Sequence, residues 1–404
     1  MSRFLPYSPD QAYLLPPSVK DELGEDHLSV FLHRVVERLD MTEFENAYSD
    51  EGGELYAPTL MLKVWLYAYA LGITSARRLE QRIREDLGLR YLAGGQRPGQ
   101  LGVKRVPAAA RAGAERPVYA GGGDGAGVGF GTAGPGGHSI RRAFEPTASR
   151  DRIDTEQRLR NERAKIRRHI RRWQKACDAS DPDQGAGTRV QVEELERRPA
   201  ELPRRLERLR KSGETRLSRR DGEARFLRER GGFALGYTAE IAVSEDNLIV
   251  AQRVTLNRCD VPALVPLVEE VEQRTGARPE NVLADGGFYS NQNVRDLEER
   301  GIEVYVPDPN LARELNTGKR ARTIGRNRVH SPELKAMRQK LRSPAGRRVY
   351  GRRKALVEPV IGVLKQQRGM RQFRTRGRVG VAAEFTLAAI AYNLTRLFTR
   401  RLAP

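Results

Sequence analysis

Apolar residues recur at helical spacing through the first 96 residues of the chain. Leu and Val residues three and four positions apart between 28 and 39 predict an amphipathic helix. Residues 58–71 are apolar on most faces, with Pro58 in the first turn and Gly72 just past the end. Proline in the first turn and glycine after the last are usual helix start and end signals. Because the helix is apolar on most faces, we expect it to be largely buried.

An arginine-rich helix is predicted directly after the apolar one. Residues 75–85 place Leu79 and Ile83 on an inner face, with Leu87 turned inward beyond them. An apolar helix, a short glycine-containing turn and a basic helix match the helix-turn-helix pattern, although a helical hairpin with a solvated basic face has the same pattern. The outward residues available to DNA are Arg77, Arg78, Arg82 and Arg84.

The next segment, residues 97–147, has neither a helical nor a strand period. Between residues 99 and 147 it holds 13 of the 39 glycines of the chain, and Leu101 and Ile140 are its only Leu and Ile residues. Such a composition cannot bury a core, so we expect this segment to lack a fixed structure.

Residues 148–230 are highly charged. Residues 154–177 predict a long basic helix with a narrow apolar stripe, and residues 190–209 predict a partner helix broken near Pro199 and Pro203. A charge run is often only a solvated face, but the one-sided excess between residues 160 and 175 favours contact with a DNA backbone. The stripe consists of Leu159, Ile166, Ile170 and Trp173, and the candidate DNA contacts are Arg167, Arg168 and Arg171.

From residue 231 onward, strands and helices alternate. The pattern predicts a mixed α/β domain in which strand ends present a carboxylate. We expect residues 310–343 to be irregular and the chain to be helical from Ala355 to the C-terminus. The other expected elements are a hairpin of 233–243 with 248–255, helices at 262–275 and 291–300, and strands at 281–284 and 302–306.

The charge balance points to a polyanionic partner. The 404 residues include 72 Lys and Arg against 52 Asp and Glu, a net charge of +20, and nucleic acid is the simplest partner for such a surplus. Two cysteines predict a cytoplasmic protein without a disulfide framework, and five scattered histidines show no zinc-ligand spacing. The most apolar run, residues 381–398, carries charged and amide side chains, so we expect no membrane span.

Asp285 is the first candidate for chemistry. It follows the short apolar strand at 281–284 and precedes Gly286 and Gly287. Open α/β sheets present active-site residues at such strand ends, and we expect the glycines to let a ligand approach. An ordinary turn aspartate would have the same local sequence.

Glu358 is the second candidate. It lies among apolar residues, seven positions before Lys365, so a helix that Pro359 helps to begin would put Glu358 and Lys365 on one face. A salt bridge to a basic neighbour is the alternative. Together with Asp285, Glu358 suggests hard-cation ligation, for which Mg²⁺ or Mn²⁺ is suited, and two such ions about 4 Å apart support phosphodiester transfer.

These stretches resemble the insertion-sequence transposases of the DDE class, whose catalytic domain has a ribonuclease H-like fold. The most specific part is the series Tyr350, Arg353, Glu358 and Lys365, separated by two, four and six residues. The first 96 residues also resemble the helical domain that these transposases carry. The other matching stretches are residues 232–243, 284–290 and 350–365 with Arg368 and Gly369.

The resemblance implies metal-dependent cleavage at the ends of the element and transfer of the freed 3′-hydroxyl to target DNA. Asp285 matches the second metal-binding carboxylate of the family and Glu358 the third. Tyr350, Arg353 and Lys365 match positions that hold DNA or support the glutamate. Double-stranded DNA, at the terminal repeats and the target, is the implied partner of a nucleoid-associated protein that acts as a homodimer.

The chain departs from the family at the first carboxylate. The family has a strand that ends in aspartate shortly before Ala148, but residues 137–146 contain no such pattern, and Asp124, Asp151 and Asp154 do not end an apolar strand. We interpret residues 99–147 as read out of frame, because codons for residues 99–102 read one base later can give Asp-Asn-Trp-Ala. Translating the gene in its other frames tests this interpretation.

We therefore predict a mixed α/β protein in which a ribonuclease H-like sheet carries a basic helical insertion. Two alternatives remain open: a non-catalytic basic DNA-binding protein, and a nuclease without strand transfer. The predicted parts are a helical DNA-binding domain at 1–96, a disordered or frame-shifted segment at 97–147, a basic insertion at 148–230 and the remaining catalytic domain at 231–400.

Overall fold

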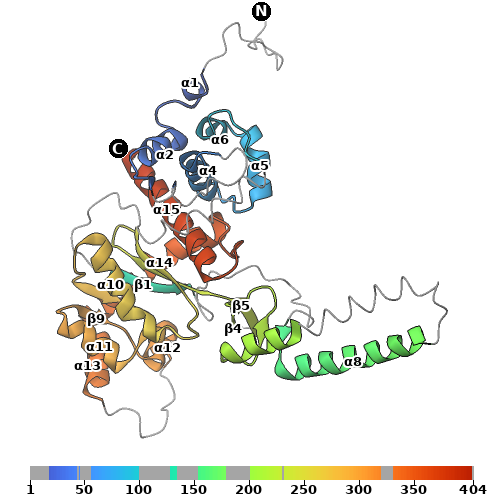
Figure 1. Ribbon diagram of the computed structural model, residues 1–404. Coiled ribbons are helices and arrows are strands. Elements are labelled where there is room, and N and C mark those ends of the chain that lie inside the picture. The colour runs from blue at the N-terminus through green and yellow to red at the C-terminus, as the bar shows by residue number, and fades with distance from the viewer. Residues whose placement is uncertain are drawn as a thin grey trace, which may run out of the picture. The chain divides into compact units, whose positions relative to one another are not determined.

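The computed structural model describes residues 18–42, 45, 56–99, 128–133, 153–178, 201–229, 232–319 and 331–402 (Figure 1). The chain divides into two compact units. One consists of residues 1–118 and 387–404, and the other of residues 119–386. Helices and small sheets are combined, so the predicted mixed α/β class is confirmed.

The N-terminal unit is built from short helices around one buried helix, α4. Ten of the 13 residues of α4 are buried, as its sequence predicted, and α6 packs against α2, α4 and α5. Leu79 and Ile83 of α5 are buried, but Leu87 is 37% exposed, so its predicted inward position is wrong. Leu87 is the first residue of α6, after the Asp86 cap, and the new helix turns it outward. The helices are α1 (Val19–Leu23), α2 (Leu28–Val36), α4 (Pro58–Ala70), α5 (Ala76–Glu85) and α6 (Leu87–Leu92).

The second unit contains a five-stranded mixed sheet. Its strand order is β7-β6-β1-β8-β9, with β1 antiparallel to β6 and parallel to β8. The first strand therefore stands at the centre, as the ribonuclease H-like prediction requires. The strands are β1 (Val128–Ala133), β6 (Thr238–Val243), β7 (Ile249–Thr255), β8 (Asn281–Leu283) and β9 (Glu303–Tyr305).

The central strand lies in the segment that we expected to have no fixed structure. Residues 128–133 pair with β6 over five residues and with β8 over two. Strand pairing uses backbone N–H and C=O groups, and β6 and β8 offer such groups on either side. A Gly-rich sequence can therefore occupy this place, although nothing in its side-chain pattern predicted it.

Helices cover both faces of the sheet. Adjacent residues of a strand point to opposite faces. Gln252 of β7 donates a 3.0 Å hydrogen bond to Thr386 of α15, whereas its neighbour Arg253 faces Glu270 of α10 at 4.0 Å. Helices α10 and α15 thus lie on opposite faces, and α14 packs against β1 and β6. The helices are α10 (Leu264–Thr275), α11 (Asn291–Glu299), α14 (Pro344–Gly362) and α15 (Arg378–Leu402).

Two sequence predictions in this region were wrong. Residues 310–343, expected to be irregular, include α12 (Pro309–Thr317) and α13 (Pro332–Arg342). Each begins with a capping residue before a proline, Asp308 and Ser331, which is a helix start signal. Helix α14 begins at Pro344 rather than near Pro359, which lies inside it. Within the described ranges, no helix is long and apolar enough to cross a membrane.

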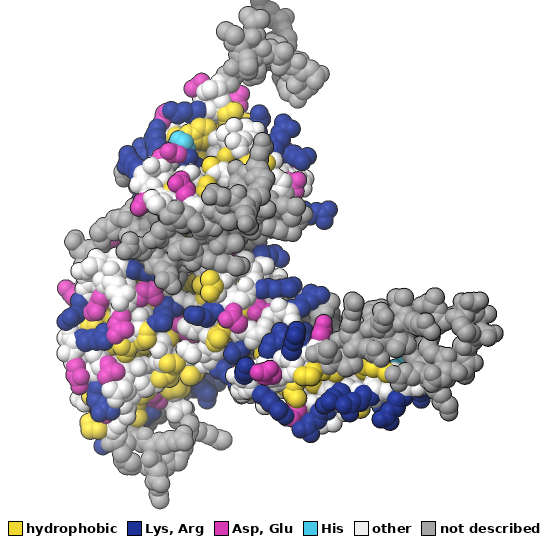
Figure 2. Space-filling model, viewed as in Figure 1, with side chains coloured by type: hydrophobic (Ala, Val, Ile, Leu, Met, Phe, Trp, Pro, Cys, Tyr) yellow, Lys and Arg dark blue, Asp and Glu magenta, His cyan; other side chains and the backbone are white. Residues whose placement is uncertain are grey.

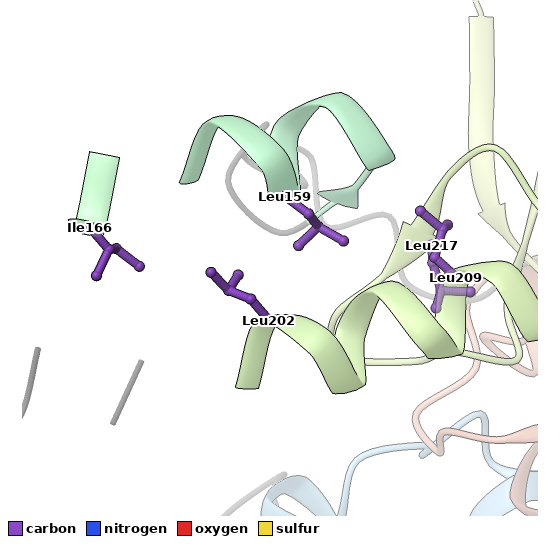
Figure 3. Close-up of a cluster of buried hydrophobic side chains, with 5 residues drawn as sticks. All are labelled: Leu159, Ile166, Leu202, Leu209 and Leu217. Atoms are coloured by element: carbon purple, nitrogen blue, oxygen red, sulfur yellow. The ribbon is translucent and has the colours of Figure 1, made fainter. Parts of the chain in front are cut away.

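The basic insertion has a small core of its own. The long helix α8 (Glu156–Asp178) forms as predicted, and its stripe residues Leu159 and Ile166 pack with leucines of the helix at residues 201–211 (Figure 3). A two-stranded sheet of β2 (Ile153–Asp154) and β3 (Leu217–Ser218) closes one end. A hairpin of β4 (Arg225–Glu229) and β5 (Gly232–Gly236) then leads to β6. The predicted helix at 190–200 lies outside the described residues.

An ion-pair network holds this insertion together. Arg205 donates to both carboxylate oxygens of Asp154, at 2.9 Å through Nε, and Arg219 donates to the same carboxylate at 2.7 Å. Both arginines also contact Glu162 of α8. Burial alone would raise the pKa of Asp154, but the hydrogen bonds from Arg205 and Arg219 hold this pKa below its ordinary value.

Candidate active site

Asp285 stands at the carboxyl end of β8, where the sequence placed it. Its backbone is extended, and its carboxylate accepts a 2.8 Å hydrogen bond from the backbone N–H of Gly286. The side chain is half-buried. The carboxylate thus caps the short turn that follows.

The two glycines after Asp285 serve the packing of the protein itself. A Cβ at Gly286 would lie 2.9 Å from Cβ of Ala312, and a Cβ at Gly287 would lie 2.5 Å from a carboxylate oxygen of Asp260. Side chains of the chain already fill both places. At Gly286, which is buried, this packing leaves no room for a ligand, whereas Gly287 is exposed and the expectation there stays a prediction.

Tyr350 and Arg353 lie side by side on α14, and the charge of Asp285 acts on Tyr350. Both side chains are buried, with exposed fractions of 7% and 4%, and the guanidinium carbon of Arg353 lies 5.7 Å from the centre of the Tyr350 ring. Burial raises the pKa of Tyr350 to about 12, Arg353 opposes this rise, and the negative charge of Asp285 adds to it. The structure thus brings Asp285, Tyr350 and Arg353 into one electrostatic neighbourhood, with the phenol uncharged.

Two polar atoms in this neighbourhood have no hydrogen-bond partner. Within the described residues, neither Oη of Tyr350 nor Nε of Arg353 makes a hydrogen bond, although both are buried. Burying such groups unpaired costs about 1–3 kcal/mol each. Unsatisfied donors next to a carboxylate are what a site for an oxygen-rich ligand requires.

Glu358 and Lys365 lie farther along the same helical segment. Glu358 is eight residues after Tyr350, about 12 Å along the helix axis, and its side chain is half-buried. Lys365 lies in a π-helical turn, Val363–Gln367, that directly follows α14. Both side chains interact with neighbouring groups. Turns of this kind are frequent at functional sites, and this one interrupts the regular spacing assumed for Glu358 and Lys365.

Helix α14 is fixed over the sheet by the turn between β6 and β7. The amide of Asn247 donates a 3.3 Å hydrogen bond to the carbonyl of Leu356, and Arg352 pairs with Glu245 at 2.6 Å. Asn247 has a φ of 58°, a left-handed conformation that asparagine tolerates. These contacts lie within two residues of Arg353 and Glu358, so they help to set the position of the predicted site residues.

The first carboxylate of the predicted triad is missing from the central strand. The sequence of β1 is Val-Gly-Phe-Gly-Thr-Ala. Asp154, one of the nearest aspartates, is bound by Arg205 and Arg219, whereas Asp124 and Asp151 lie outside the described residues. In the part of the chain that the structure describes, no three acidic, histidine or cysteine side chains come together as a metal site would need.

Sequence reasoning missed a further acid, Glu240, in the interior of the sheet. It is 0% exposed, one of its oxygens accepts a 3.1 Å hydrogen bond from Thr255, and the other has no partner among the described residues. Burial raises the pKa of Glu240 to about 7. A lone Glu in the strand Thr-Ala-Glu-Ile-Ala-Val was the available signal, because its neighbours are apolar.

The predicted DNA contacts of α8 form an exposed basic surface. Figure 2 shows Lys and Arg side chains along this helix. Six of the ten residues between 163 and 172 are Lys or Arg and none is acidic. Arg167, Arg168 and Arg171 are exposed, and none of the three forms an ion pair with an acid in the described part of the insertion. Positive charge is therefore free to meet a polyanion on this side of α8.

The predicted contacts of α5 are also exposed, but they are partly neutralised. Arg82 lies 3.8 Å from Glu85, and Arg84 lies 3.6 Å from Glu80. Arg77 and Arg78, at the start of the helix, are exposed as well. The surplus of positive charge on α5 is thus smaller than on α8.

Comparisons with known proteins agree with this architecture. Residues 216–394 match the family described as Transposase DDE domain. Residues 17–100 match the family described as Transposase domain (DUF772). The first match covers the sheet from β6 onward with α14, and the second covers the N-terminal helices. No curated protein and no solved structure matches the chain.

Proposed function

This chain belongs to the insertion-sequence transposases of the DDE class, and we propose that it binds the ends of its element through basic helices but cleaves and joins DNA weakly. The observation that carries this proposal is the central strand. Asp285 follows β8, which pairs with the central strand β1, and β1 contributes no carboxylate.

DNA binding is assigned to two helical surfaces. Arg167, Arg168 and Arg171 on α8 would contact phosphates, since they are exposed and without acidic partners in the described insertion. Arg77, Arg78 and Arg82 of α5 would do the same in the N-terminal unit. The duplexes bound are the terminal repeats of the element and its target, and two copies of the chain would act on paired ends.

Divalent metal ions generally serve transposases with this domain, and Mg²⁺ or Mn²⁺ suits carboxylate ligands. Asp285 and Glu358 are the residues of the predicted triad that remain to hold them. Because no third acid joins them in the described residues, the side chains present do not fit a two-metal site. We therefore assign no cleavage step to a bound ion in the chain as it stands.

The residues around Asp285 have roles that need no metal. Arg353 and Tyr350 offer unpaired donors that would bind phosphate oxygens or support Glu358. Lys365, one π-helical turn beyond α14, would contact the DNA strand as a point charge. These three side chains would hold and orient the end of a DNA strand.

A non-catalytic DNA-binding protein is the second candidate, and the missing carboxylate favours it. Cleavage of 3′ ends in Mg²⁺, measured beside a version in which codons 99–147 are read in the family-like frame, separates the two. We expect the chain as written to be far slower. Equal rates would refute the proposed impairment, and a frame-restored protein that cuts DNA without joining it to a target plasmid would identify a nuclease instead.

The assignment of α8 is tested by salt dependence. Changing Arg167, Arg168 and Arg171 together to Gln removes positive charge from the proposed interface, so the slope of log K against log salt falls by about 0.9 for each phosphate that is no longer neutralised. A matched triple variant of Arg278, Arg295 and Arg342, which pair with acids, removes the same charge elsewhere. If the two triple variants behave alike, the effect is one of net charge and α8 is not a specific DNA contact.

A further inference from the structure

A basic loop joins the π-helical turn to α15. Between Glu358 and Glu384 the sequence contains six basic residues and no acidic one. Five of the six are arginines that lie within residues 368–378, which we call the arginine loop and whose last residue begins α15. A run of this kind concentrates positive charge on a short stretch of chain. The arginines are Arg368, Arg371, Arg374, Arg376 and Arg378.

Buried apolar side chains fix the arginine loop to the protein. Met370 and Phe373 are buried, and the Phe373 ring meets the ring of Phe385 of α15 edge-on, with 6.2 Å between the ring centroids. Arg371 and Arg374, each next in sequence to one of these anchors, are exposed. The loop is therefore held against the core, while arginines lie at its surface.

Glu384 of α15 holds the backbone of the loop. Its carboxylate accepts hydrogen bonds from the backbone N–H groups of Arg374 and Thr375, both at 2.8 Å, and from the hydroxyl of Thr375 at 2.7 Å. A buried carboxylate needs such partners, because burying it without them is costly. These bonds therefore fix the conformation of the loop at residues 374 and 375.

Two acids of the insertion hold the end of the loop in the same way. Asp221 accepts a 3.4 Å hydrogen bond from the backbone N–H of Gly377 and a 2.7 Å bond from the hydroxyl of Tyr237. Glu223 accepts a 2.6 Å bond from the backbone N–H of Arg378. Gly377 has a φ of 74°, a conformation that favours glycine. The insertion thus binds the backbone at the end of the loop.

Arg376 and Arg378 present their charge to solvent. Both are exposed, and neither guanidinium forms an ion pair in the part of the chain that the structure describes. A guanidinium keeps its charge and can donate two parallel hydrogen bonds to phosphate oxygens. Because the backbone of the loop is already fixed, little conformational entropy is lost when a ligand binds. The regular negative charge of a DNA backbone is complementary to such a surface.

We infer that the arginine loop is a further DNA-contact surface, on which Arg376 and Arg378 bind phosphates of the duplex. This inference rests on the proposed function, because it takes DNA as the ligand, and it adds a contact that neither α8 nor α5 provides. Asp221, Glu223 and Glu384 act as positioning residues for the loop. Phosphate contacts carry no sequence information, so we expect the loop to bind duplexes of any sequence.

The first test changes Arg376 and Arg378 together to Gln in the full chain and measures binding of a short duplex of mixed sequence without metal. We expect binding to weaken about three- to tenfold, and the slope of log K against log salt to fall by about 0.9 for each phosphate that is released. The matched control changes Arg278 and Arg342, which pair with acids, and removes the same charge. Equal effects of the two double variants would overturn the inference.

The second test uses the unchanged chain and so does not depend on how a variant folds. Modification of arginines by phenylglyoxal is followed by mass spectrometry, and the duplex should slow it several-fold at Arg376 and Arg378 but not at Arg278 and Arg342. Poly-glutamate at equal charge concentration should protect the loop less. Protection by poly-glutamate that equals or exceeds protection by the duplex would identify an acidic protein segment as the ligand and overturn the inference.

The two tests also separate this inference from the proposed function. A chain that binds no duplex and shows no protected arginine would reject DNA binding altogether. A chain that binds the duplex with Arg167, Arg168 and Arg171 of α8 protected, but with Arg376 and Arg378 modified at the same rate as without DNA, would reject only the arginine loop.

Discussion

The basic insertion and the central sheet each bury a carboxylate, with opposite consequences. Asp154 of the insertion is 3% exposed and receives hydrogen bonds from Arg205 and Arg219. Glu240 of the sheet is 0% exposed and receives one from the Thr255 hydroxyl. The pKa of Asp154 is lowered and that of Glu240 is raised to about 7. Whether a buried acid keeps its charge thus depends on its hydrogen-bond and ion-pair partners, and not on burial alone.

The opposite pKa shifts of the two acids follow from the different cores of the two regions. The sheet packs against the buried apolar side chains of its helices, so a buried acid without a basic partner weakens it. The insertion has a core of five buried apolar residues, too few to fix α8 without help, and its ion network supplies the rest. The insertion has more arginines than its ion network uses, and the remaining ones are exposed on α8, where the proposed DNA contacts lie.

The largest effect is expected for Asp154→Asn. It leaves two arginines without their buried acceptor, which costs about 3–5 kcal/mol for a broken buried pair. Limited proteolysis should show cleavage within residues 148–230, while the central sheet resists. Glu156→Gln, which removes an exposed acid two residues later, at the start of α8, is the control. An Asp154→Asn protein as resistant as this control would mean that the apolar cluster alone holds the insertion.

The network also predicts a pH dependence. Because the pKa of Asp154 is lowered in the folded protein, its contribution to stability is present above the pKa of the unfolded chain. It is lost as the pH falls through the folded value. Resistance of the insertion to proteolysis should therefore decline in acid, and Asp154→Asn should remove part of this decline.

The next largest effect, of opposite sign, is expected for Glu240→Gln. The pKa of Glu240 rises from 4.5 to about 7 on folding, so the folded state binds the proton more tightly. Stability is full below pH 4.5 and declines as the pH rises to 7, by about 3 kcal/mol. The amide carries no charge, so the variant should melt higher than the unchanged chain at pH 8.

The two proteins should melt alike at pH 5, where Glu240 is already protonated. Thermal unfolding followed by circular dichroism at both pH values makes the comparison. A variant that is less stable at pH 8 would show that the carboxylate is charged and satisfied, and would remove the contrast with Asp154.

The two regions also differ in how far the sequence predicted them. Apolar periodicity predicted α8, α10 and β6–β7 closely, because each buries a side-chain pattern. Strand β1 was not predicted, because its pairing depends on backbone groups and leaves no pattern of apolar side chains in the sequence. Helices α12 and α13 were not predicted, although each begins with a capping residue and a proline, at Asp308 and Ser331.

The candidate site was predicted in parts. Asp285 stands at the strand end that the sequence indicated, its charge acts on Tyr350, and Arg353 lies beside Tyr350. The roles of Asp285, Glu358 and the basic residues remain predictions. The register of β1 with β8 could not be predicted, because a Gly-rich strand can pair in several registers.

The smallest effect is expected at the surface of the sheet region, for Arg352→Gln. Arg352 pairs with Glu245 at 2.6 Å, but its side chain is 55% exposed, and exposed pairs contribute about 0.2–1 kcal/mol. Urea unfolding should show a difference of this size that shrinks as salt is added. A loss as large as that of Asp154→Asn would mean that the pair anchors α14 to the β6–β7 turn. Charge would then stabilise the sheet region as strongly as it does the insertion, and burial would no longer explain the difference between them.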